Sequence, residues 1–166
     1  MQNLIEAKKI SLVFPESSSP LFSGVNLFLT DNVQALIGRN GVGKSCLAAI
    51  LADRLQPSEG SVHRFCKVGY LAQGEALLTG TAADILDVSE IQQVSSRVLA
   101  GEGTPKDFSF MDDKWSWEVE TEALLAEGEL SLDILDRTFK SLSGGEQTRL
   151  KLLALKMQGC DFLILD

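Results

Sequence analysis

The sequence is poor in cysteine, and its few cysteines are badly placed for cross-linking. Cys46, Cys66 and Cys160 are odd in number, widely spaced, and never part of a Cys-x-x-Cys pair. This pattern excludes a disulfide framework and a zinc site built on such pairs. It is typical of free thiols in a reducing compartment, so we expect a cytoplasmic location.

Long apolar runs are missing as well. No run approaches the roughly 20 residues that a helix needs to cross a bilayer, so we expect no membrane span. Residues 1–10 carry charges where a secretory signal would have an apolar segment. The sequence therefore predicts a chain without a secretory signal.

Basic residues are scarce and scattered. Fifteen lysines and arginines stand against 23 acidic residues, which gives a formal net charge of -8. Contact with nucleic-acid phosphates needs clustered lysine and arginine, so the composition excludes a general nucleic-acid binder. The 166 residues are 45% apolar and 23% charged, which is the mixture of one ordinary globular domain.

Strand-like segments are present at both ends of the chain. They are predicted over residues 5–14, 25–29, 33–37, 61–65, 67–71 and 162–165. The run 33–37 has the continuous apolar character of a strand buried on both faces. A helix follows residue 44 and carries Leu47, Ile50, Leu51 and Leu55 on one face. We expect Pro57 to end that helix.

Beyond residue 73 the pattern becomes helical. Thr81 and Asp84 form a candidate capping box, which precedes a helical stripe of Leu86, Ile91, Val94 and Val98. Residues 104–113 are predicted as a loop. A helical turn is expected near 132–136, and longer helices over 113–127 and 144–157. The order predicts an α/β sheet with a mainly helical subdomain inserted between its strands.

Inward faces can be proposed for the two longer helices. The helix over 113–127 is expected to bury Trp115, Val119, Ala123 and Ala126, with its glutamates on a solvated face. The helix over 144–157 is expected to bury Leu150, Leu153, Ala154 and Met157. The two tryptophans permit two interpretations. They form a partner-binding patch, or Trp115 packs inward with Trp117 at the subdomain edge, which we favour.

Residues 38–45, GRNGVGKS, match the pattern G-x-x-x-x-G-K-[ST] in full. An apolar run precedes them and an amphipathic helix follows, which favours a phosphate-binding loop over an ordinary glycine-rich turn. Glycines let the backbone N–H groups wrap a phosphate at the helix N-terminus. Lys44 would reach the β- and γ-phosphates, and the Ser45 hydroxyl would ligate Mg²⁺. The expected nucleotide contacts here are Gly38, Asn40, Gly41, Gly43, Lys44, Ser45 and Cys46, although Cys46 also suits packing.

A second phosphate site is predicted where Ser143, Gly144 and Gly145 open a helix. Ser143 is a good N-cap, and the glycines leave room for a phosphate beside the backbone. An ordinary helix cap is the alternative. The strand over 162–165 ends in Asp166, which is where P-loop proteins place a carboxylate that holds Mg²⁺.

The phosphate loop, Gln73, LSGGEQ over 142–147 and FLILD over 162–166 stand in the order that resembles the ATP-binding-cassette ATPases. The resemblance covers nearly all of the chain and implies binding of ATP and Mg²⁺. It implies that Gln73 contacts Mg²⁺ and the attacking water, so that Lys44 and Gln73 are the catalytic residues. It also implies that Phe14 stacks on adenine. The alternatives are a surface amide for Gln73 and a core strand residue for Phe14.

The chain resembles the ABC-F group in particular. Glu146 stands where transporter subunits usually carry glutamine, and Leu21-Phe22, residues 37–41 and the Trp- and Glu-rich helix add to the likeness. That implies a cytoplasmic ATPase whose partner is a second cassette, in the same chain or as a homodimer, and which acts on the ribosome. The alternatives are a nucleotide-binding subunit of a membrane transporter and an interaction fragment that does not hydrolyse ATP.

The chain departs from the family pattern after Asp166, where a glutamate and a switch histidine are expected. The only histidine, His63, is predicted to be an ordinary strand residue. We therefore expect a single incomplete nucleotide-binding domain that turns ATP over scarcely at all. Residues 1–74 and 158–166 would form its α/β core, and residues 75–157 would form the helical subdomain with the signature helix.

Overall fold

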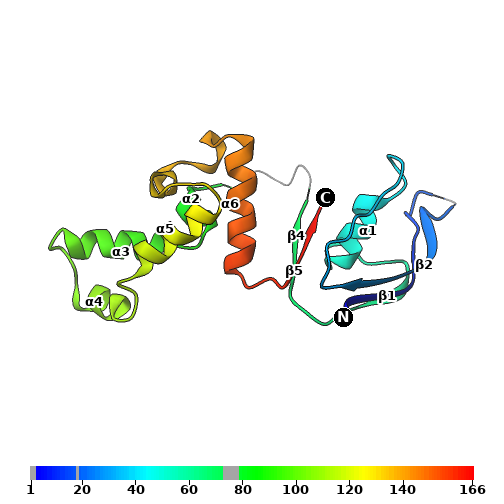
Figure 1. The fold of residues 1–166 in the computed structure, drawn as a ribbon, viewed down its shortest axis with the longest axis horizontal. Coiled ribbons are helices and arrows are strands. Elements are labelled where there is room, and N and C mark those ends of the chain that lie inside the picture. The colour runs from blue at the N-terminus through cyan, green and yellow to red at the C-terminus, as the bar shows by residue number, and fades with distance from the viewer. Residues whose placement is uncertain (1–2, 18, 73–78) are drawn as a thin grey trace. The chain divides into compact units, whose positions relative to one another are not determined.

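The computed structural model describes residues 3–17, 19–72 and 79–166. The chain divides into two compact units (Figure 1). The strand unit comprises Met1–Glu75 with Gly159–Asp166, and the helical unit comprises Ala76–Gln158. Among the described residues, none of the helices has the length and apolar character needed to span a membrane.

The strand unit is built on β1 (Asn3–Leu12). This strand lies between β2 (Phe22–Thr30) and β3 (Glu59–Arg64), and it is antiparallel to both. Its buried side chains form one face of the sheet and the centre of an apolar core; they are Ile5, Ala7, Ile10 and Leu12. The three strands confirm the predicted strands in this part of the chain, with bounds shifted by a few residues.

Helix α1 (Lys44–Leu51) covers that core with Leu47, Ile50 and Leu51. It ends well before Pro57, so the predicted end of the helix is wrong. The cause is local: Asp53 takes a left-handed conformation with φ 63°. In addition, the Arg64 side chain donates hydrogen bonds to the carbonyls of Ile50 and Leu51 at 2.6 and 2.8 Å, which satisfies the last turn.

A second sheet in the strand unit consists of β4 (Val68–Leu71) and β5 (Phe162–Leu165). The two strands are parallel and lie side by side in Figure 1, in a register that pairs Val68 with Phe162 and Leu71 with Leu165. Parallel neighbours need a long crossover, and the whole helical unit is inserted between them in the sequence. Both strands were predicted and are confirmed.

The predicted strand over residues 33–37 is wrong. These residues belong to no strand, Val33 is fully exposed, and Ile37 is 90% exposed. An apolar run becomes a strand only where a neighbouring edge accepts its backbone hydrogen bonds. Within the described residues no backbone hydrogen bond joins this run to another strand. The sequence therefore identified its apolar character but not its pairing.

The helical unit contains five α-helices and two 3₁₀ turns among its described residues. They are α2 (Ala82–Ile85), α3 (Ser89–Leu99), α4 (Pro105–Met111), α5 (Trp117–Glu127), η1 (Leu132–Asp136), η2 (Phe139–Ser141) and α6 (Gly144–Met157). Their shared core gathers Phe139, Leu125 and Leu150, all buried, with neighbours from α2 and η1. The predicted capping box of Thr81 and Asp84, the turn at 132–136 and the bounds of α6 are confirmed.

The predicted loop over 104–113 is wrong, because most of it is helix α4. Thr104 caps this helix through its hydroxyl, Pro105 occupies the first turn, and Asp107 completes a capping box. Threonine, proline and an acidic residue at the third helical position are a helix-start signal. The signal was present in the sequence and was missed.

The expected inward faces of the two longer helices need correction. In α5 the buried residues are Thr121 and Leu125, whereas Trp115 is 54% exposed and Val119 is 69% exposed. Trp117, expected at the edge, packs against the core. In α6, Leu150, Leu153 and Ala154 are buried as expected, but Met157 is exposed.

Candidate functional site

Two positions of the loop over 38–44 have a backbone conformation that glycine accommodates best. Gly41 and Gly43 have φ values of 81° and 98°, which lie in the left-handed region. A β-carbon on Gly43 would lie 2.8 Å from the Leu21 Cδ2 atom, whereas one on Gly41 would meet nothing within 4 Å. The loop therefore needs glycine at residue 43 for two reasons, conformation and space.

The N-terminus of α1 is open. It has no side-chain cap and no acidic residue in its first turn. Within the described part of the chain, no group accepts the backbone N–H of Lys44, Ser45 or Cys46. The Lys44 ammonium folds back over the loop and donates to the carbonyls of Gly38 and Arg39, each at 3.0 Å. Positive charge and free donors are thus concentrated at one point, where an anion would be stabilised.

Asp166, which directly follows β5, lies next to the N-terminus of α1. The Ser45 hydroxyl donates to the Oδ1 atom of Asp166 at 2.9 Å, across 121 positions of sequence. The Tyr70 hydroxyl donates to the other carboxylate oxygen at 3.3 Å, from β4. Ser45 and Asp166, both predicted as metal ligands, are therefore brought together. Tyr70 was not predicted, because its position beside Asp166 depends on the parallel register of β4 and β5.

A cavity of about 530 Å³ opens beside these groups. Its apolar lining comes from α1, β2, β5 and residues 35–36, and its polar lining includes Gln34, Lys44 and Asp166. A largely apolar cavity with a few convergent polar groups is the usual form of a small-molecule site. The run 33–37, which was expected to be a strand, thus contributes a wall of the cavity.

The remaining residues predicted in the strand unit have mixed placements. Phe14 lies beyond the end of β1 and is 44% exposed, so it is not a core residue of that strand. Asn40 is exposed in the loop. Cys46 is partly buried and packs against the core of the strand unit. Gln73 lies outside the described residues.

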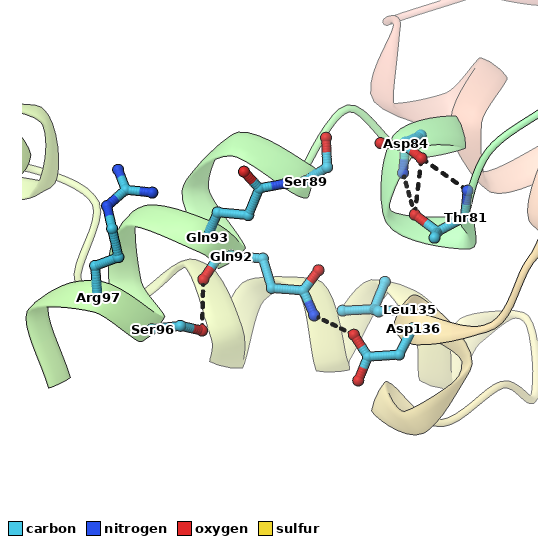
Figure 2. A pocket seen from close by; sticks show the side chains of 9 residues that line it. All are labelled: Thr81, Asp84, Ser89, Gln92, Gln93, Ser96, Arg97, Leu135 and Asp136. Atoms are coloured by element: carbon cyan, nitrogen blue, oxygen red, sulfur yellow. Dashed lines mark hydrogen bonds between the residues drawn. The ribbon is translucent and has the colours of Figure 1, made fainter. Parts of the chain in front are cut away.

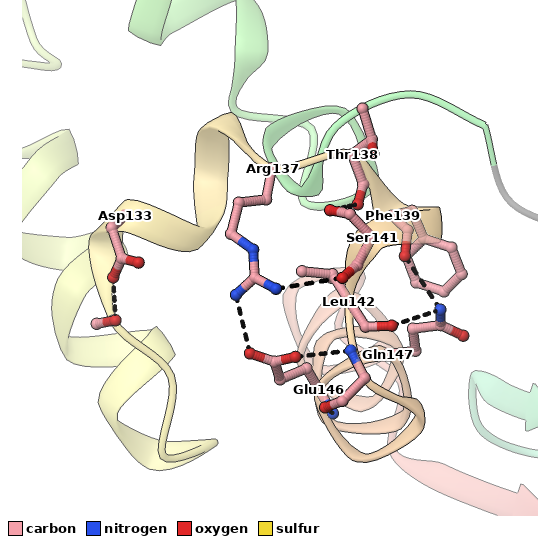
Figure 3. Close-up of polar contacts among 10 residues, drawn as sticks. Asp133, Arg137, Thr138, Phe139, Ser141, Leu142, Glu146 and Gln147 are labelled. Atoms are coloured by element: carbon pink, nitrogen blue, oxygen red, sulfur yellow. Dashed lines mark hydrogen bonds and ion pairs between the residues drawn. The ribbon is translucent and has the colours of Figure 1, made fainter.

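In the helical unit, the N-terminus of α6 is closed by its own side chains. Ser143 is the N-cap as predicted, and its hydroxyl accepts the backbone N–H of Glu146. The Glu146 carboxylate accepts the Ser143 N–H at 2.7 Å and pairs with Arg137 at 3.0 Å (Figure 3). The Ser143 hydrogen bonds, followed by Arg137, hold the pKa of Glu146 below its usual range, so the carboxylate is ionised at neutral pH. Gly144 and Gly145 form the exposed first turn.

The turn that precedes α6 is held by the side-chain amide of Gln147, a residue of α6 itself. The Gln147 side chain donates to the carbonyls of Phe139 and Leu142 at 3.1 and 3.0 Å (Figure 3). These bonds satisfy the carbonyls of the turn that leads into the helix. Gln147 was not predicted as important, and its signal lay within the LSGGEQ motif itself.

A second cavity of about 480 Å³ lies in the helical unit, between α2, α3 and η1 (Figure 2). Its polar groups largely bond to one another: Gln92 donates to Asp136 at 2.8 Å, and Ser96 donates to the Gln92 carbonyl. Asp84 is engaged by Thr81, which keeps the pKa of Asp84 below its usual range. Because these donors and acceptors already have partners, the cavity is a weaker candidate than the site at Ser45 and Asp166.

The oxygen atoms of Ser45 and Asp166 suit Mg²⁺. This cation prefers hard oxygen ligands and is usually held by one or two protein oxygens together with phosphate and water. Among the described residues no cluster of three or more histidine, cysteine, aspartate or glutamate side chains could form a full metal cage. The residues present therefore fit a metal ion shared with a phosphate ligand.

Two curated relatives cover almost all of this chain. The ATP-binding protein Uup of Caulobacter vibrioides is 35% identical over 155 residues, which are 91% of this chain and 21% of Uup. The zinc import ATP-binding protein ZnuC of Vibrio vulnificus is 30% identical over 169 residues, which are 100% of this chain and 56% of ZnuC. The chain thus spans only part of the length of either relative.

Solved structures share the fold. One is an ATP-binding subunit of an ABC transporter, with a TM-score of 0.69 at 18% identity, covering 98% of this chain and 65% of that one. Another is cbiO1 from Clostridium perfringens, part of the transporter complex cbiONQ, with a TM-score of 0.66 at 16% identity, covering 100% and 66%. They confirm the expected class, an α/β P-loop NTPase core with an inserted helical subdomain. Residues 25–166 match the family described as ABC transporter, and the chain belongs to that family as a carrier of its ATPase domain.

Proposed function

We propose that this chain binds ATP with Mg²⁺ and, when paired with a second cassette, hydrolyses it to ADP and phosphate. The observation that supports this proposal most is the hydrogen bond between Ser45 and Asp166 at the uncapped N-terminus of α1. The Ser45 hydroxyl oxygen and the Asp166 Oδ1 atom are 2.9 Å apart. The first turn offers free N–H donors, and Lys44 adds a full positive charge. Few arrangements other than a polyphosphate site would need all of these at one point.

Within this proposal Ser45 and Asp166 hold Mg²⁺, which when bound supplies positive charge that neutralises the β- and γ-phosphates. Tyr70 keeps Asp166 oriented toward Ser45 by its hydrogen bond to the second carboxylate oxygen. Lys44 exchanges its loop carbonyls for phosphate oxygens, and charge-assisted contacts of this kind are stronger than neutral ones. Phe14, exposed beyond β1, is proposed to stack on adenine, and Gln73 to position the attacking water.

Ser143, Gly144 and Gly145 are proposed to face the γ-phosphate held by another cassette. The capping box supports this, because it holds the exposed Ser143 hydroxyl at the N-terminus of α6. The exposed glycines place no side chain between that hydroxyl and an approaching phosphate. The partner is therefore a second cassette, in the same longer protein or as a second copy, and the two units here form one nucleotide-binding domain.

The more specific proposal is a cytoplasmic ABC-F type ATPase that acts on the ribosome. It is supported by Glu146 in the LSGGEQ motif, where the carboxylate has a structural use as cap and as partner of Arg137. The second candidate is the nucleotide-binding subunit of a transporter. It is favoured by the likeness to ZnuC, a zinc import ATP-binding protein, which extends over the whole chain.

Nucleotide binding is tested by titrating a fluorescent ATP analogue with and without Mg²⁺. Lys44→Ala should weaken binding at least tenfold, because a charge-assisted contact of about 1.5–3 kcal/mol is lost. Asp166→Asn should weaken binding only when Mg²⁺ is present. Lys106→Ala, at an exposed lysine of α4, is the matched control and should bind as the parent does. Equal binding by the Lys44 and Lys106 variants would refute the site.

The two candidate processes are separated by fractionation of cells that express the full-length protein. An ABC-F type ATPase should sediment with ribosomes when a non-hydrolysable ATP analogue is present. A transporter subunit should instead fractionate with membranes and leave them when its membrane partner is deleted. Sedimentation with neither would contradict both assignments while leaving nucleotide binding intact.

A further inference from the structure

Helix α5 carries an apolar stripe on the side that faces away from the core. Val119, Ala123 and Ala126 recur at helical spacing, Trp115 lies two residues before the helix, and all four are exposed. Trp115 is 54% exposed and Val119 is 69% exposed. From Val119 to Ala126 the stripe extends over about 10 Å, or two turns, at 1.5 Å per residue. This surface is called the α5 face below.

The α5 face is distinct from the side of the helix that packs against the core. The opposite side of the helix already packs against the core of the helical unit, through Trp117, Leu124 and Leu125. Thr121, on that same side, is buried as well. The helix therefore has two apolar sides, and only one of them has a partner among the described residues. A large exposed aromatic residue in line with other apolar side chains is typical of an interaction surface.

Acidic residues flank the α5 face on both sides. At 3.6 residues per turn, Glu118 and Glu122 run along one side, and Glu120 and Glu127 run along the other. Glu120 is bonded to Ser116, and Glu127 is paired with Lys156. Neither Glu118 nor Glu122 has a hydrogen bond or ion pair within the described part of the chain. Their charges are therefore available to a partner.

The helical unit as a whole is strongly acidic. It contains fifteen of the 23 acidic residues but only eight of the 15 basic ones, so nearly all of the net charge of -8 lies here. Asp112 and Asp113 add two exposed carboxylates immediately before Trp115. A surface of this sign repels nucleic acid and anionic lipid, and it attracts a basic protein segment.

We propose that the α5 face docks an amphipathic helix of a partner protein, whose apolar stripe is flanked by lysine or arginine. Ala123 and Ala126 allow the two helix axes to approach closely, and Trp115 supplies the large anchor at one end. Glu118 and Glu122 pair with the basic flank and set the orientation of the partner helix. The proposal goes beyond nucleotide binding and uses none of its residues.

The test uses a synthetic helical peptide of about three turns with a leucine stripe flanked by lysines, and a second peptide in which glutamates replace the lysines. The chain has two tryptophans, so Trp117→Phe leaves Trp115 as the only tryptophan reporter. The lysine peptide should shift the Trp115 emission to shorter wavelength, and the glutamate peptide should not. Calorimetric titration then gives the affinity of each variant without relying on fluorescence.

Two sets of variants locate the binding. Trp115→Ala, and separately the pair Glu118→Lys and Glu122→Lys, should each weaken the lysine peptide about tenfold or more. The pair Glu90→Lys and Glu102→Lys changes the net charge equally at exposed positions off the α5 face, and should bind nearly as the parent does. Lys44→Ala should bind the peptide normally, which separates this test from that of the nucleotide site. Thermal unfolding verifies that each variant is folded.

Several results would overturn the proposal. One is equal loss of affinity in both charge-reversal pairs, which would indicate attraction without a defined face. Others are absence of peptide binding, equal binding of the glutamate peptide, and a Trp115 shift with RNA or anionic vesicles in place of the peptide. Trp115 emission that is already typical of a buried indole in the free full-length protein would show that another segment covers the face.

Discussion

The N-terminus of α1 in the strand unit and those of three helices in the helical unit are built in opposite ways. In the strand unit, α1 begins at a glycine in the left-handed region and has neither a cap nor an acidic residue in its first turn. In the helical unit, α2, α4 and α6 each begin with a capping box that supplies a hydroxyl and a carboxylate from the chain itself. The first N–H groups of α1 are therefore left without a side-chain cap, whereas those of α2, α4 and α6 are capped by their own side chains.

The contrast shows how a fold reserves an anion site. A capping carboxylate satisfies free N–H groups and neutralises the positive end of the helix, so a phosphate gains little by binding there. Omission of the cap costs stability, but it leaves the donors of Lys44, Ser45 and Cys46 available. At α6 the capping box remains, so fewer donors of its first turn are available to a phosphate. We therefore expect α1 to be the main phosphate site and α6 an auxiliary one.

The largest effect on the uncapped N-terminus of α1 is expected from Gly43→Ala. The new β-carbon would require a left-handed alanine and would displace Leu21, which lies 2.8 Å away. We expect the free energy of unfolding to fall by about 2–4 kcal/mol, from backbone strain and overpacking together. Urea unfolding measures it. Gly41→Ala has the same backbone penalty with no clash, and should lose only about 1 kcal/mol. Equal losses would mean that the space around Gly43 is not limiting.

A carboxylate placed at the third position of α1 should make this helix resemble α2, α4 and α6. Cys46→Glu supplies it, and we expect ATP-analogue affinity to fall about tenfold through repulsion at short range. Cys46→Gln has nearly the same shape without the charge and is the matched control. If both variants lose affinity alike, steric change rather than charge is responsible. That result would contradict the claim that a carboxylate in the first turn keeps a phosphate from binding.

Local signals in the sequence predicted local structure well. The bounds of α6, the capping box at Thr81 and the strand β5 were predicted and are confirmed. The pairing of Ser45 with Asp166 is present as the motifs implied. Tyr70 could not be found in this way, because its contact depends on the register between two strands that are distant in sequence. The strand predicted over residues 33–37 is wrong for a related reason, because apolar character does not specify which neighbouring strand would pair with the run.

Helix α5 shows a different limit. Both of its sides are apolar, one with Trp115, Val119 and two alanines, the other with Trp117 and the leucines at 124 and 125. Periodicity alone cannot choose between two apolar stripes on one helix. Burial of the larger leucine side chains removes more apolar surface from water, and that side faces the core. A comparison of side-chain size, rather than of spacing, would have predicted the correct face.

Removal of a cap in the helical unit should have a moderate effect. Thr104→Ala deletes the hydroxyl that accepts the Asp107 N–H, and we expect a loss of about 1 kcal/mol, the usual cost of an N-cap. Urea unfolding monitored by far-ultraviolet circular dichroism measures it. Thr79→Ala, at an exposed threonine with no hydrogen bond within the described residues, is the control. Nucleotide affinity should not change in either variant. A fall in affinity with Thr104→Ala would show that the two kinds of helix start are not independent.

The smallest effect expected is a difference in acid sensitivity that arises from Asp107. Its carboxylate accepts hydrogen bonds from Arg97 at 2.6 Å and from the Thr104 hydroxyl and backbone at 2.7 and 2.9 Å. These contacts, Arg97 first, hold the pKa of Asp107 well below its usual range. Because the folded-state pKa is lowered, the stabilisation is fully present above the unfolded pKa of about 4 and is lost as the pH falls toward the folded value.

Unfolding of the parent and of Asp107→Asn from pH 7 down to pH 2 tests this linkage. The parent should be the more stable at neutral pH, and the difference should stay constant to about pH 5 and then narrow, because the unfolded parent takes up a proton that the folded parent resists. Asp84 and Glu146 also have lowered pKa values, but they are present in both proteins and cancel in the difference. Asp113→Asn, which removes an exposed carboxylate with no hydrogen bond or ion pair in the described chain, is the matched control. A difference that widens in acid would mean that Asp107 is stabilised by something other than its ionised contacts with Arg97 and Thr104.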